Sequence, residues 1–247
     1  GHIFGYHHLQ AVTPHFFGTS EQRDYFYKGT VEHNWFWGNA INPRDRRLIA
    51  TPDGSGYRLN GIKYFCSGSQ DSDILVVCAE FPEEQKPRIF VVPTKREGII
   101  VHDDWEGIGQ RQTDSGTVTF ENVKVEKHEF LETPGINGRP FATLRTCLTQ
   151  LLMTNVFVGI AQGAFKEAQK YTHSYTRSWI GEKATEDPLI LRQYGELWAK
   201  ISAAEQLTNQ AALVFQRAWE TGDELTEEQR GESAISIATA KVIAAQT

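Results

Sequence analysis

The spacing of apolar residues along the 247-residue chain changes from helical to strand-like and back to helical. Residues 1 to about 33 have helical spacing with one interruption, and Thr19 is placed to cap the helix that follows it. From residue 34 to about residue 125, short alternating runs are bounded by Gly, Pro, Asn and Asp, which is typical of strands. One such boundary, Asp53-Gly54-Ser55-Gly56, predicts a turn.

Helical spacing returns after Pro134-Gly135. The apolar pattern predicts a long helix beginning near Phe141, a second beginning at Glu186-Asp187-Pro188, and a third capped by Thr226. Because the chain opens within one pattern and stops inside an apolar helical run, we expect its last domain to be incomplete. The predicted fold class is α+β, with an N-terminal helical part over residues 1–33, a central β-barrel domain of about seven strands over residues 34–134, and a C-terminal helical bundle over residues 135–247.

Charge and cysteine content argue against several classes of protein. The net charge of −6 disfavours a nucleic-acid-binding protein, which needs a basic surface. Three cysteines without metal-binding spacing favour a reducing compartment, and we expect a cytoplasmic location. No apolar run looks long enough to span a membrane and no signal peptide is visible, so we expect no membrane partner. His2, His7 and His8 have no cysteine or carboxylate nearby, and no metal site is expected.

The segment Lys63-Tyr64-Phe65-Cys66-Ser67-Gly68 is the first candidate for chemistry. We predict a short strand here, on which Phe65 and Ser67 point to the same face. Taken alone, Ser67 is an ordinary strand serine, since its neighbours do not form the Gly-x-Ser-x-Gly turn of a nucleophile. A second strand is expected to place three residues on one face, where aromatic rings usually belong to a core but a buried amide needs partners: Trp35, Trp37 and Asn39.

A second segment completes a recognisable pattern. Trp105 precedes Gly107-Ile108-Gly109-Gln110-Arg111-Gln112-Thr113-Asp114-Ser115, and the runs Thr117–Phe120 and Val123–Val125 are expected to be strands. In this order, ahead of a helical half, the two segments resemble the middle of the acyl-CoA dehydrogenase superfamily. The resemblance is to its flavin-dependent monooxygenase branch, because Asn42-Pro43 stands where dehydrogenases usually have Glu-Pro. The glycines of the second segment fail the Gly-x-Gly-x-x-Gly fingerprint of nicotinamide binding.

This resemblance implies a flavin site. It places the face of Phe65 and Ser67 at the reactive edge of the flavin ring, where the Ser67 hydroxyl could donate a hydrogen bond to a developing peroxide or accept one from reduced N5–H. His2 and Tyr6, one helical turn apart, would face the same edge. The resemblance therefore predicts three catalytic residues, Ser67, Tyr6 and His2; five flavin-binding residues, Asn39, Phe65, Ser67, Trp105 and Arg177, with Arg177 on the phosphate; and two substrate-binding residues, Phe4 and Trp37.

The resemblance also implies an activity. It predicts a two-component monooxygenase that takes reduced FMN, with FAD less expected, from a separate NADH-dependent flavin reductase. Oxygen would be captured as a C4a-hydroperoxyflavin and passed to the sulfur of an aromatic thiophene such as dibenzothiophene, giving the sulfoxide and then the sulfone. A further histidine would lie beyond Thr247, and the assembly would be a homotetramer.

Three other functions stay open on the sequence. An acyl-CoA dehydrogenase would use FAD to take a hydride from an acyl thioester, and its base could lie outside this chain. A flavin N-hydroxylase would act on amines or amino sugars, although the aromatic-rich start disfavours a polar substrate. A helical scaffold without flavin would be recognised by its failure to bind any flavin.

Overall fold

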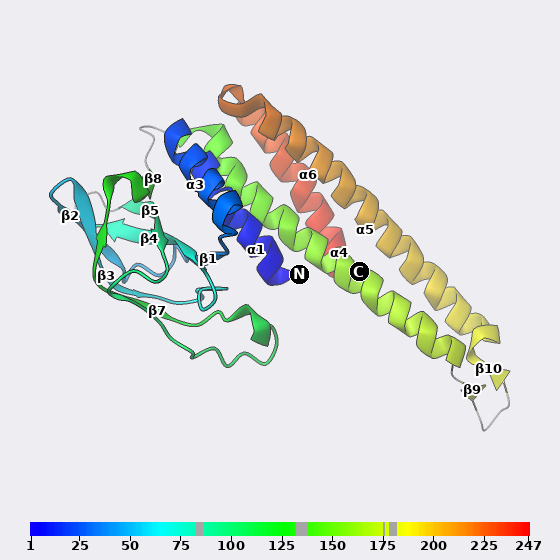
Figure 1. The fold of residues 1–247 in the computed structure, drawn as a ribbon. Coiled ribbons are helices and arrows are strands. Elements are labelled where there is room, and N and C mark those ends of the chain that lie inside the picture. The colour runs from blue at the N-terminus through cyan, green and yellow to red at the C-terminus, as the bar shows by residue number, and fades with distance from the viewer. Residues whose placement is uncertain (83–85, 132–137, 175, 178–181) are drawn as a thin grey trace. The chain divides into compact units, whose positions relative to one another are not determined.

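The computed structural model describes residues 1–82, 86–131, 138–174, 176–177 and 182–247. The chain divides into two compact units, Gly1–Ala142 and Thr143–Thr247 (Figure 1). The predicted boundary between residues 134 and 135 falls outside the described residues.

Three helices open the first unit, and they confirm the predicted break and cap. They are α1 (His2–Ala11), α2 (Thr13–Phe17) and α3 (Ser20–His33). The Thr19 hydroxyl accepts from the Gln22 N–H, while the Gln22 side chain accepts from the Thr19 N–H, so a capping box starts α3. Gln22 Nε2 also donates to the carbonyl oxygens of His128 and Phe130, at 2.8 and 2.7 Å. The cap therefore anchors α3 to a distant part of the chain.

Among the described residues, eight strands form one mixed sheet. Its path runs β6-β7-β3-β2-β4-β5-β8, with β1 beside β4, and the pairs of β4 with β1 and β2 are parallel. The predicted turn at Gly54-Ser55 joins β2 to β3. The strands are β1 (Trp37–Ala40), β2 (Ile49–Asp53), β3 (Gly56–Lys63), β4 (Ile74–Phe81), β5 (Lys86–Pro93), β6 (Ile99–Val101), β7 (Val118–Val125) and β8 (Phe130–Leu131).

The strand β7 corrects one prediction, because it joins the two runs that were expected to be separate strands. Its register with β3 shifts between Leu59 and Gly61, where Asn122 has a left-handed φ of 53° and its N–H donates to Asn60 Oδ1 at 2.8 Å. This bulge keeps the two halves of β7 in one ladder despite the break in the apolar alternation.

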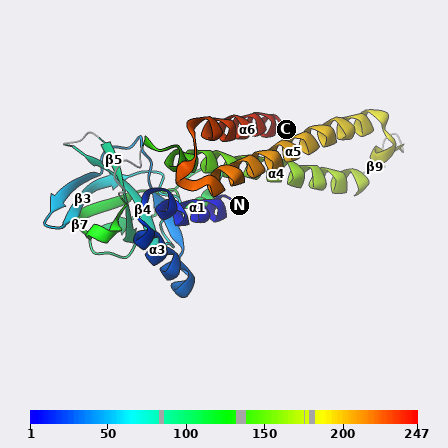
Figure 2. The same ribbon diagram turned by 90° about the horizontal axis from the view of Figure 1, so that it is seen from above.

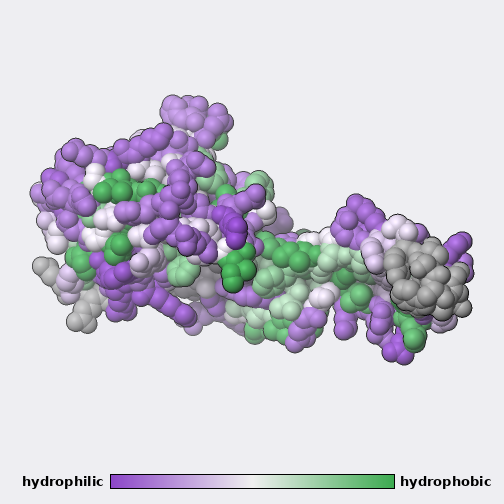
Figure 3. Space-filling view, turned by 90° about the horizontal axis from the view of Figure 1, so that it is seen from below, coloured by the Kyte–Doolittle hydropathy of each residue, from purple (hydrophilic) through white to green (hydrophobic). Residues whose placement is uncertain are grey.

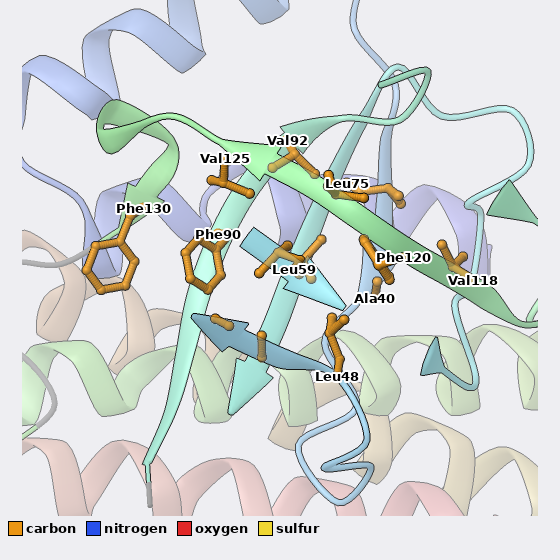
Figure 4. Packing of buried hydrophobic residues seen from close by; sticks show 14 of the residues in the cluster. Ala40, Leu48, Leu59, Leu75, Phe90, Val92, Val118, Phe120, Val125 and Phe130 are labelled. Carbon is orange, nitrogen blue, oxygen red and sulfur yellow. The ribbon is translucent and has the colours of Figure 1, made fainter. Parts of the chain in front are cut away.

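The strand β4 is buried on both faces. Leu75 and Val77 belong to the cluster inside the sheet, whereas Ile74 and Val76 belong to a second cluster that includes Phe26 of α3. In Figure 4 the labelled side chains of the first cluster point into one interior, among them Leu59, Leu75, Phe90, Phe120 and Val125. Burial on both faces explains why β4 reads as a continuous apolar run rather than an alternating one.

Two side chains of α1, His7 and Gln10, tie this helix to β1 and to the residue before it. His7 Nδ1 accepts from the Trp37 N–H at 3.2 Å, and its ring stacks on Phe36 with centroids 5.3 Å apart and planes 5° apart. Gln10 Nε2 donates to Asn39 Oδ1 at 3.3 Å. Burial lowers the pKa of His7, and the neighbouring His8 lowers it further. The acceptor role of Nδ1 requires the neutral imidazole that these effects favour.

The second unit is built on three long helices that lie alongside one another (Figure 2). Asp187 caps the second by accepting from the Leu189 N–H at 2.8 Å, and Thr226 forms a capping box with Gln229 at the third, so both predicted starts are confirmed. The helices are α4 (Pro140–Ser174), α5 (Pro188–Thr221) and α6 (Glu227–Gln246), with two short strands, β9 (Thr176–Arg177) and β10 (Glu182–Lys183), between the first two.

The expectation about membrane spans is wrong in one respect. By length and composition α4 could cross a membrane, because it contains an 18-residue window with a mean hydropathy of 1.3. The sequence hides this window because its large apolar residues are interspersed with Thr, Asn, Gly and Ala. A core helix of a soluble bundle passes the same test, and Val158 of α4 is buried in a cluster with Ala204 of α5 and Ala244 of α6.

The bulge predicts a strong dependence on glycine. Gly61 has φ +133°, and a Cβ there would lie 2.1 Å from the Arg47 carbonyl oxygen. Gly61→Ala in the full-length protein should lower the free energy of unfolding by about 3 kcal/mol or more. Gly54→Ala is the matched control, since Gly54 also has positive φ (+61°) but no atom lies within 4 Å of its Cβ position. Its cost should be about 1 kcal/mol; equal losses in denaturant titrations would contradict the role given to the bulge.

The His7 contact predicts a pH dependence. Its pKa is lowered from the usual 6.5 in the folded protein, so the unfolded chain binds more protons below that pH. The stabilisation from neutral His7 is therefore fully present above pH 6.5 and is lost as the pH falls below it. His7→Gln keeps an acceptor that does not titrate, so unfolding free energies between pH 7 and 5 should fall less steeply in the variant. Identical slopes would show that the bond to Trp37 does not depend on protonation.

Candidate functional site

The segment after β3 is a turn, and the predicted strand through Ser67 is wrong. β3 ends at Lys63, and Phe65 has a left-handed φ of 58°, which strand geometry does not allow. Phe65 and Ser67 therefore do not alternate along one strand face. Phe65 is 59% exposed, whereas Ser67 is 7% exposed. The turn thus presents an aromatic ring to the surface and keeps a hydroxyl beneath it.

Lys63 anchors the start of this turn. Its side chain is 1% exposed, and Nζ donates to the carbonyl oxygens of Asn42 and Asp45, at 3.0 and 2.6 Å. Burial lowers the pKa of Lys63. The carboxylate of Asp45 in turn accepts from the Tyr64 N–H at 3.0 Å. The lysine of the motif is thus a structural support that joins the segment after β1 to the turn after β3.

The turn is joined to the loop that precedes β7. The Phe65 and Trp105 rings meet edge to face, with centroids 6.1 Å apart. Trp105 Nε1 donates to the carbonyl oxygen of Gln110 at 2.9 Å, which holds the indole in place. Three backbone N–H groups of the turn donate across to the loop: Cys66 to the Gly116 carbonyl at 3.0 Å, Gly68 to the Thr113 carbonyl at 2.8 Å, and Gln70 to the Asp114 carboxylate at 2.8 Å.

A chain of hydroxyl groups also connects the turn to the loop. Ser67 Oγ lies 2.8 Å from Ser115 Oγ, which lies 2.7 Å from Thr113 Oγ1, and Thr113 Oγ1 donates to the Gln110 carbonyl at 2.8 Å. All three hydroxyl-bearing residues are buried. Sequence reasoning identified Ser67 but missed Thr113 and Ser115, although both lie in the segment from Gly107 to Ser115 that carries the family resemblance.

Asn39 supports the turn from the side of β1. Its N–H donates to the Ser67 carbonyl at 3.1 Å and its Nδ2 donates to the Phe65 carbonyl at 3.2 Å. Its Oδ1 accepts from Gln10 Nε2 and from the Ile41 N–H. The buried amide thus has the partners that the sequence required. Its predicted contact with flavin stays a prediction.

Backbone strain gathers in the same place. Of the five described non-glycine residues with positive φ, three belong to the turn and the loop: Phe65, Gln110 and Asp114. Such conformations cost about 1–3 kcal/mol each and persist where surrounding contacts enforce them. Their clustering points to a functional site in this part of the first unit.

The predicted residues of α1 are only partly brought together with the turn. His2 and Tyr6 stack with centroids 4.6 Å apart, which confirms that they share a face. Among the described residues, no hydrogen bond or ring contact joins either of them to Ser67. Phe4 is 70% exposed and meets His8 edge to face. Roles for His2, Tyr6 and Phe4 therefore stay predictions.

Two other predicted residues lie elsewhere. Trp37 is 1% exposed, packs against Phe26 and donates from Nε1 to Thr30 Oγ1 at 2.9 Å. The prediction that Trp37 contacts substrate is wrong, because its ring is buried in the core between β1 and α3. Arg177 belongs to β9, but its side chain lies outside the described part of the chain. The residues that the structure describes include no group of three or more metal-binding side chains.

An exposed phenylalanine packed against a half-buried tryptophan, in the same turn as a buried hydroxyl, suits a planar heterocycle. Phe65 and Trp105 offer ring surface, and Ser67 offers a polar contact at its edge. The resulting site is apolar with few directional groups, which fits the ring of a flavin better than a charged ligand.

Comparison with known proteins agrees with this geometry. Two family models match the chain: acyl-CoA dehydrogenase, middle domain, over residues 44–123, and acyl-CoA dehydrogenase, C-terminal domain, over residues 151–247. The chain is 42% identical to a probable FMNH2-dependent monooxygenase, SfnC, from Pseudomonas putida, covering 99% of the chain and 63% of the relative.

Two solved structures are also similar. Methanesulfinate monooxygenase MsuC from Pseudomonas fluorescens has 44% identity and a TM-score of 0.96, over 99% of this chain and 64% of its own. Dibenzothiophene monooxygenase TdsC from Paenibacillus sp. A11-2, in a complex with FMN and indole, has 39% identity and a TM-score of 0.92, over 99% of this chain and 65% of its own. The chain spans less than two thirds of the length of each relative. It belongs to the acyl-CoA dehydrogenase superfamily, in the branch of flavin-dependent monooxygenases.

Proposed function

We propose that the full-length protein is a monooxygenase that binds reduced FMN at the turn after β3 and oxygenates the sulfur of a small substrate. The observation that carries the proposal is the exposed Phe65 packed against Trp105, in the same turn as the buried hydroxyl of Ser67. Its support from relatives is the FMN complex of TdsC and the FMNH2 dependence attributed to SfnC.

The residues of the first unit would bind and orient the ring of FMN. Phe65 and Trp105 would contact its apolar surface, and Ser67 would hydrogen-bond to its polar edge. Asn39 would hold the turn in place through Phe65 and Ser67. Bound reduced FMN supplies the electrons that activate oxygen, while the protein supplies orientation and exclusion of water. Arg177 stays our candidate for the phosphate, because a guanidinium matches phosphate geometry.

Sulfur is the proposed atom of reaction because the named substrates of two similar monooxygenases share it. Dibenzothiophene and methanesulfinate both carry a sulfur atom with a lone pair, on which an oxygen atom can be placed. The exposed Phe4 and the aromatic residues of α1 favour an aromatic thiophene. The 44% identity to MsuC favours a sulfinate as the second candidate.

The partners follow from this chemistry. Reduced FMN would come from a separate NADH-dependent flavin reductase. We propose a cytoplasmic location because Cys66 and Cys147 are buried free thiols.

Turnover with reduced FMN and oxygen tests the function. The full-length protein should convert dibenzothiophene, or failing that methanesulfinate, to a product heavier by one oxygen atom, as read by mass spectrometry. An acyl-CoA dehydrogenase would instead oxidise an acyl thioester without incorporating oxygen. Failure to bind flavin in either redox state would overturn the proposal.

Ser67→Ala tests the role of the hydroxyl. The variant should still bind FMN but should give about three- to ten-fold less oxygenated product per reduced FMN consumed, with more hydrogen peroxide, because it lacks one neutral hydrogen bond. Ser72→Ala is the control: Ser72 is a buried serine bonded to Thr94 Oγ1 at 2.7 Å and lies outside the hydroxyl chain. If both variants couple oxygen use to product equally well, Ser67 has no role beyond the turn.

The surface of the second unit predicts a homo-oligomer, with a tetramer expected from the family. Apolar surface is visible along its helices in Figure 3. Large apolar side chains of α5 are exposed, among them Leu189, Leu191, Trp198 and Leu213. The full-length protein should sediment as a tetramer, and a monomer at micromolar concentration would contradict this prediction.

A further inference from the structure

The hydroxyl chain beneath Phe65 has a fixed direction. The Gln110 carbonyl oxygen can only accept, so the bond from Thr113 Oγ1 uses the single hydrogen of the Thr113 hydroxyl. Ser115 must therefore donate to Thr113, across 2.7 Å, and Ser67 must donate to Ser115, across 2.8 Å. Reversing either of these two bonds would set two lone pairs against each other at hydrogen-bond distance, between residues that are buried.

The Gln110 carbonyl oxygen, which is the last acceptor of the hydroxyl chain, is held in place by further hydrogen bonds. The Gln110 carbonyl oxygen also accepts from the Trp105 indole at 2.9 Å and from the Thr113 N–H at 3.1 Å. Gln110 has a left-handed φ of 54°, a conformation that non-glycine residues rarely adopt. Exposed fractions of 3% for Thr113 and 7% for Ser115 leave these hydroxyls little contact with water. The direction is therefore a property of the folded loop.

The consequence falls on Ser67. Because its only hydrogen points to Ser115, the rest of its oxygen can offer only lone pairs. A ligand at Ser67 is thus favoured if it donates a hydrogen bond and disfavoured if it accepts one. The two redox forms of flavin differ in this respect at N5, which carries a hydrogen when reduced and a bare lone pair when oxidised.

We propose that Thr113 and Ser115 are positioning residues that keep Ser67 an acceptor and so make the site prefer reduced over oxidised FMN. The inference rests on the proposed function, since it requires flavin at Ser67. In this proposal the Thr113 and Ser115 hydroxyls act on the cofactor through Ser67 and not by direct contact. The sequence left Ser67 as either a donor or an acceptor toward the flavin. The direction of the hydroxyl chain makes it an acceptor.

The test compares the dissociation constants of oxidised FMN and chemically reduced FMN, measured without oxygen on the full-length protein. The wild type should bind the reduced form more tightly. Thr113→Val removes the acceptor of Ser115, which can then turn toward Ser67 and free the Ser67 hydrogen to donate. The ratio of oxidised to reduced dissociation constants should fall about five-fold, the effect of one neutral hydrogen bond. This corresponds to a fall of about 20 mV in the potential of bound FMN.

Matched variants separate positioning from a general loss of structure. Ser115→Ala should shift the ratio in the same direction, whereas Thr113→Ser keeps the hydroxyl and should restore it. Thr94→Val removes a buried threonine hydroxyl that is bonded to Ser72 and is not part of the hydroxyl chain, so it should leave the ratio unchanged. In a Ser67→Ala background, Thr113→Val should have no further effect on the ratio.

The outcomes distinguish the two proposals. A wild type that binds neither form of FMN overturns the proposed function and this inference with it. Flavin binding with a ratio that Thr113→Val and Ser115→Ala both leave unchanged overturns only the inference. A shift that persists in the Ser67→Ala background also overturns it, because the effect would then not pass through Ser67.

Discussion

The turn after β3 keeps its shape because its backbone groups find partners on both sides. On one side, Asn39 uses its N–H and its side-chain amide to bind the carbonyl oxygens of Ser67 and Phe65. On the other, Cys66 and Gly68 donate to carbonyls of the loop before β7. Without these bonds a left-handed phenylalanine would be unfavourable by about 1–3 kcal/mol, and the segment would continue as the strand that its residues suggest.

The sheet makes this arrangement rigid. β4 is buried on both faces, so β1 beside it is held between the inner cluster and the helices α1 and α3. Asn39 therefore sits on a strand with little freedom to move, and His7 and Gln10 fasten α1 to the same strand. The turn after β3 is therefore positioned by a strand that is itself fixed by core packing.

The chemistry assigned to the site depends on direction as much as on position. An isolated serine hydroxyl can rotate to donate or to accept, and its residue type does not decide between the two. Linking Ser67 through Ser115 and Thr113 to a carbonyl removes that freedom. A site meant to take up a flavin in one redox state gains from such a fixed polarity, because discrimination comes from the group left without a partner in the wrong state.

The sequence by itself determined the features that depend on neighbours within a few residues. The caps at Thr19 and Thr226, the helix start at Asp187, the turn at Gly54-Ser55 and the order of helical and β segments were all predicted, since each rests on local bonds or on periodicity. Motif spacing also identified the family and Ser67. The tertiary structure decided what Ser67 is part of: its hydroxyl partner lies 48 positions away, and the turn that holds it depends on Asn39, 26 positions before Phe65. Tertiary structure also decided that Trp37 is a core residue, because its burial depends on packing against α3, which no local pattern predicts.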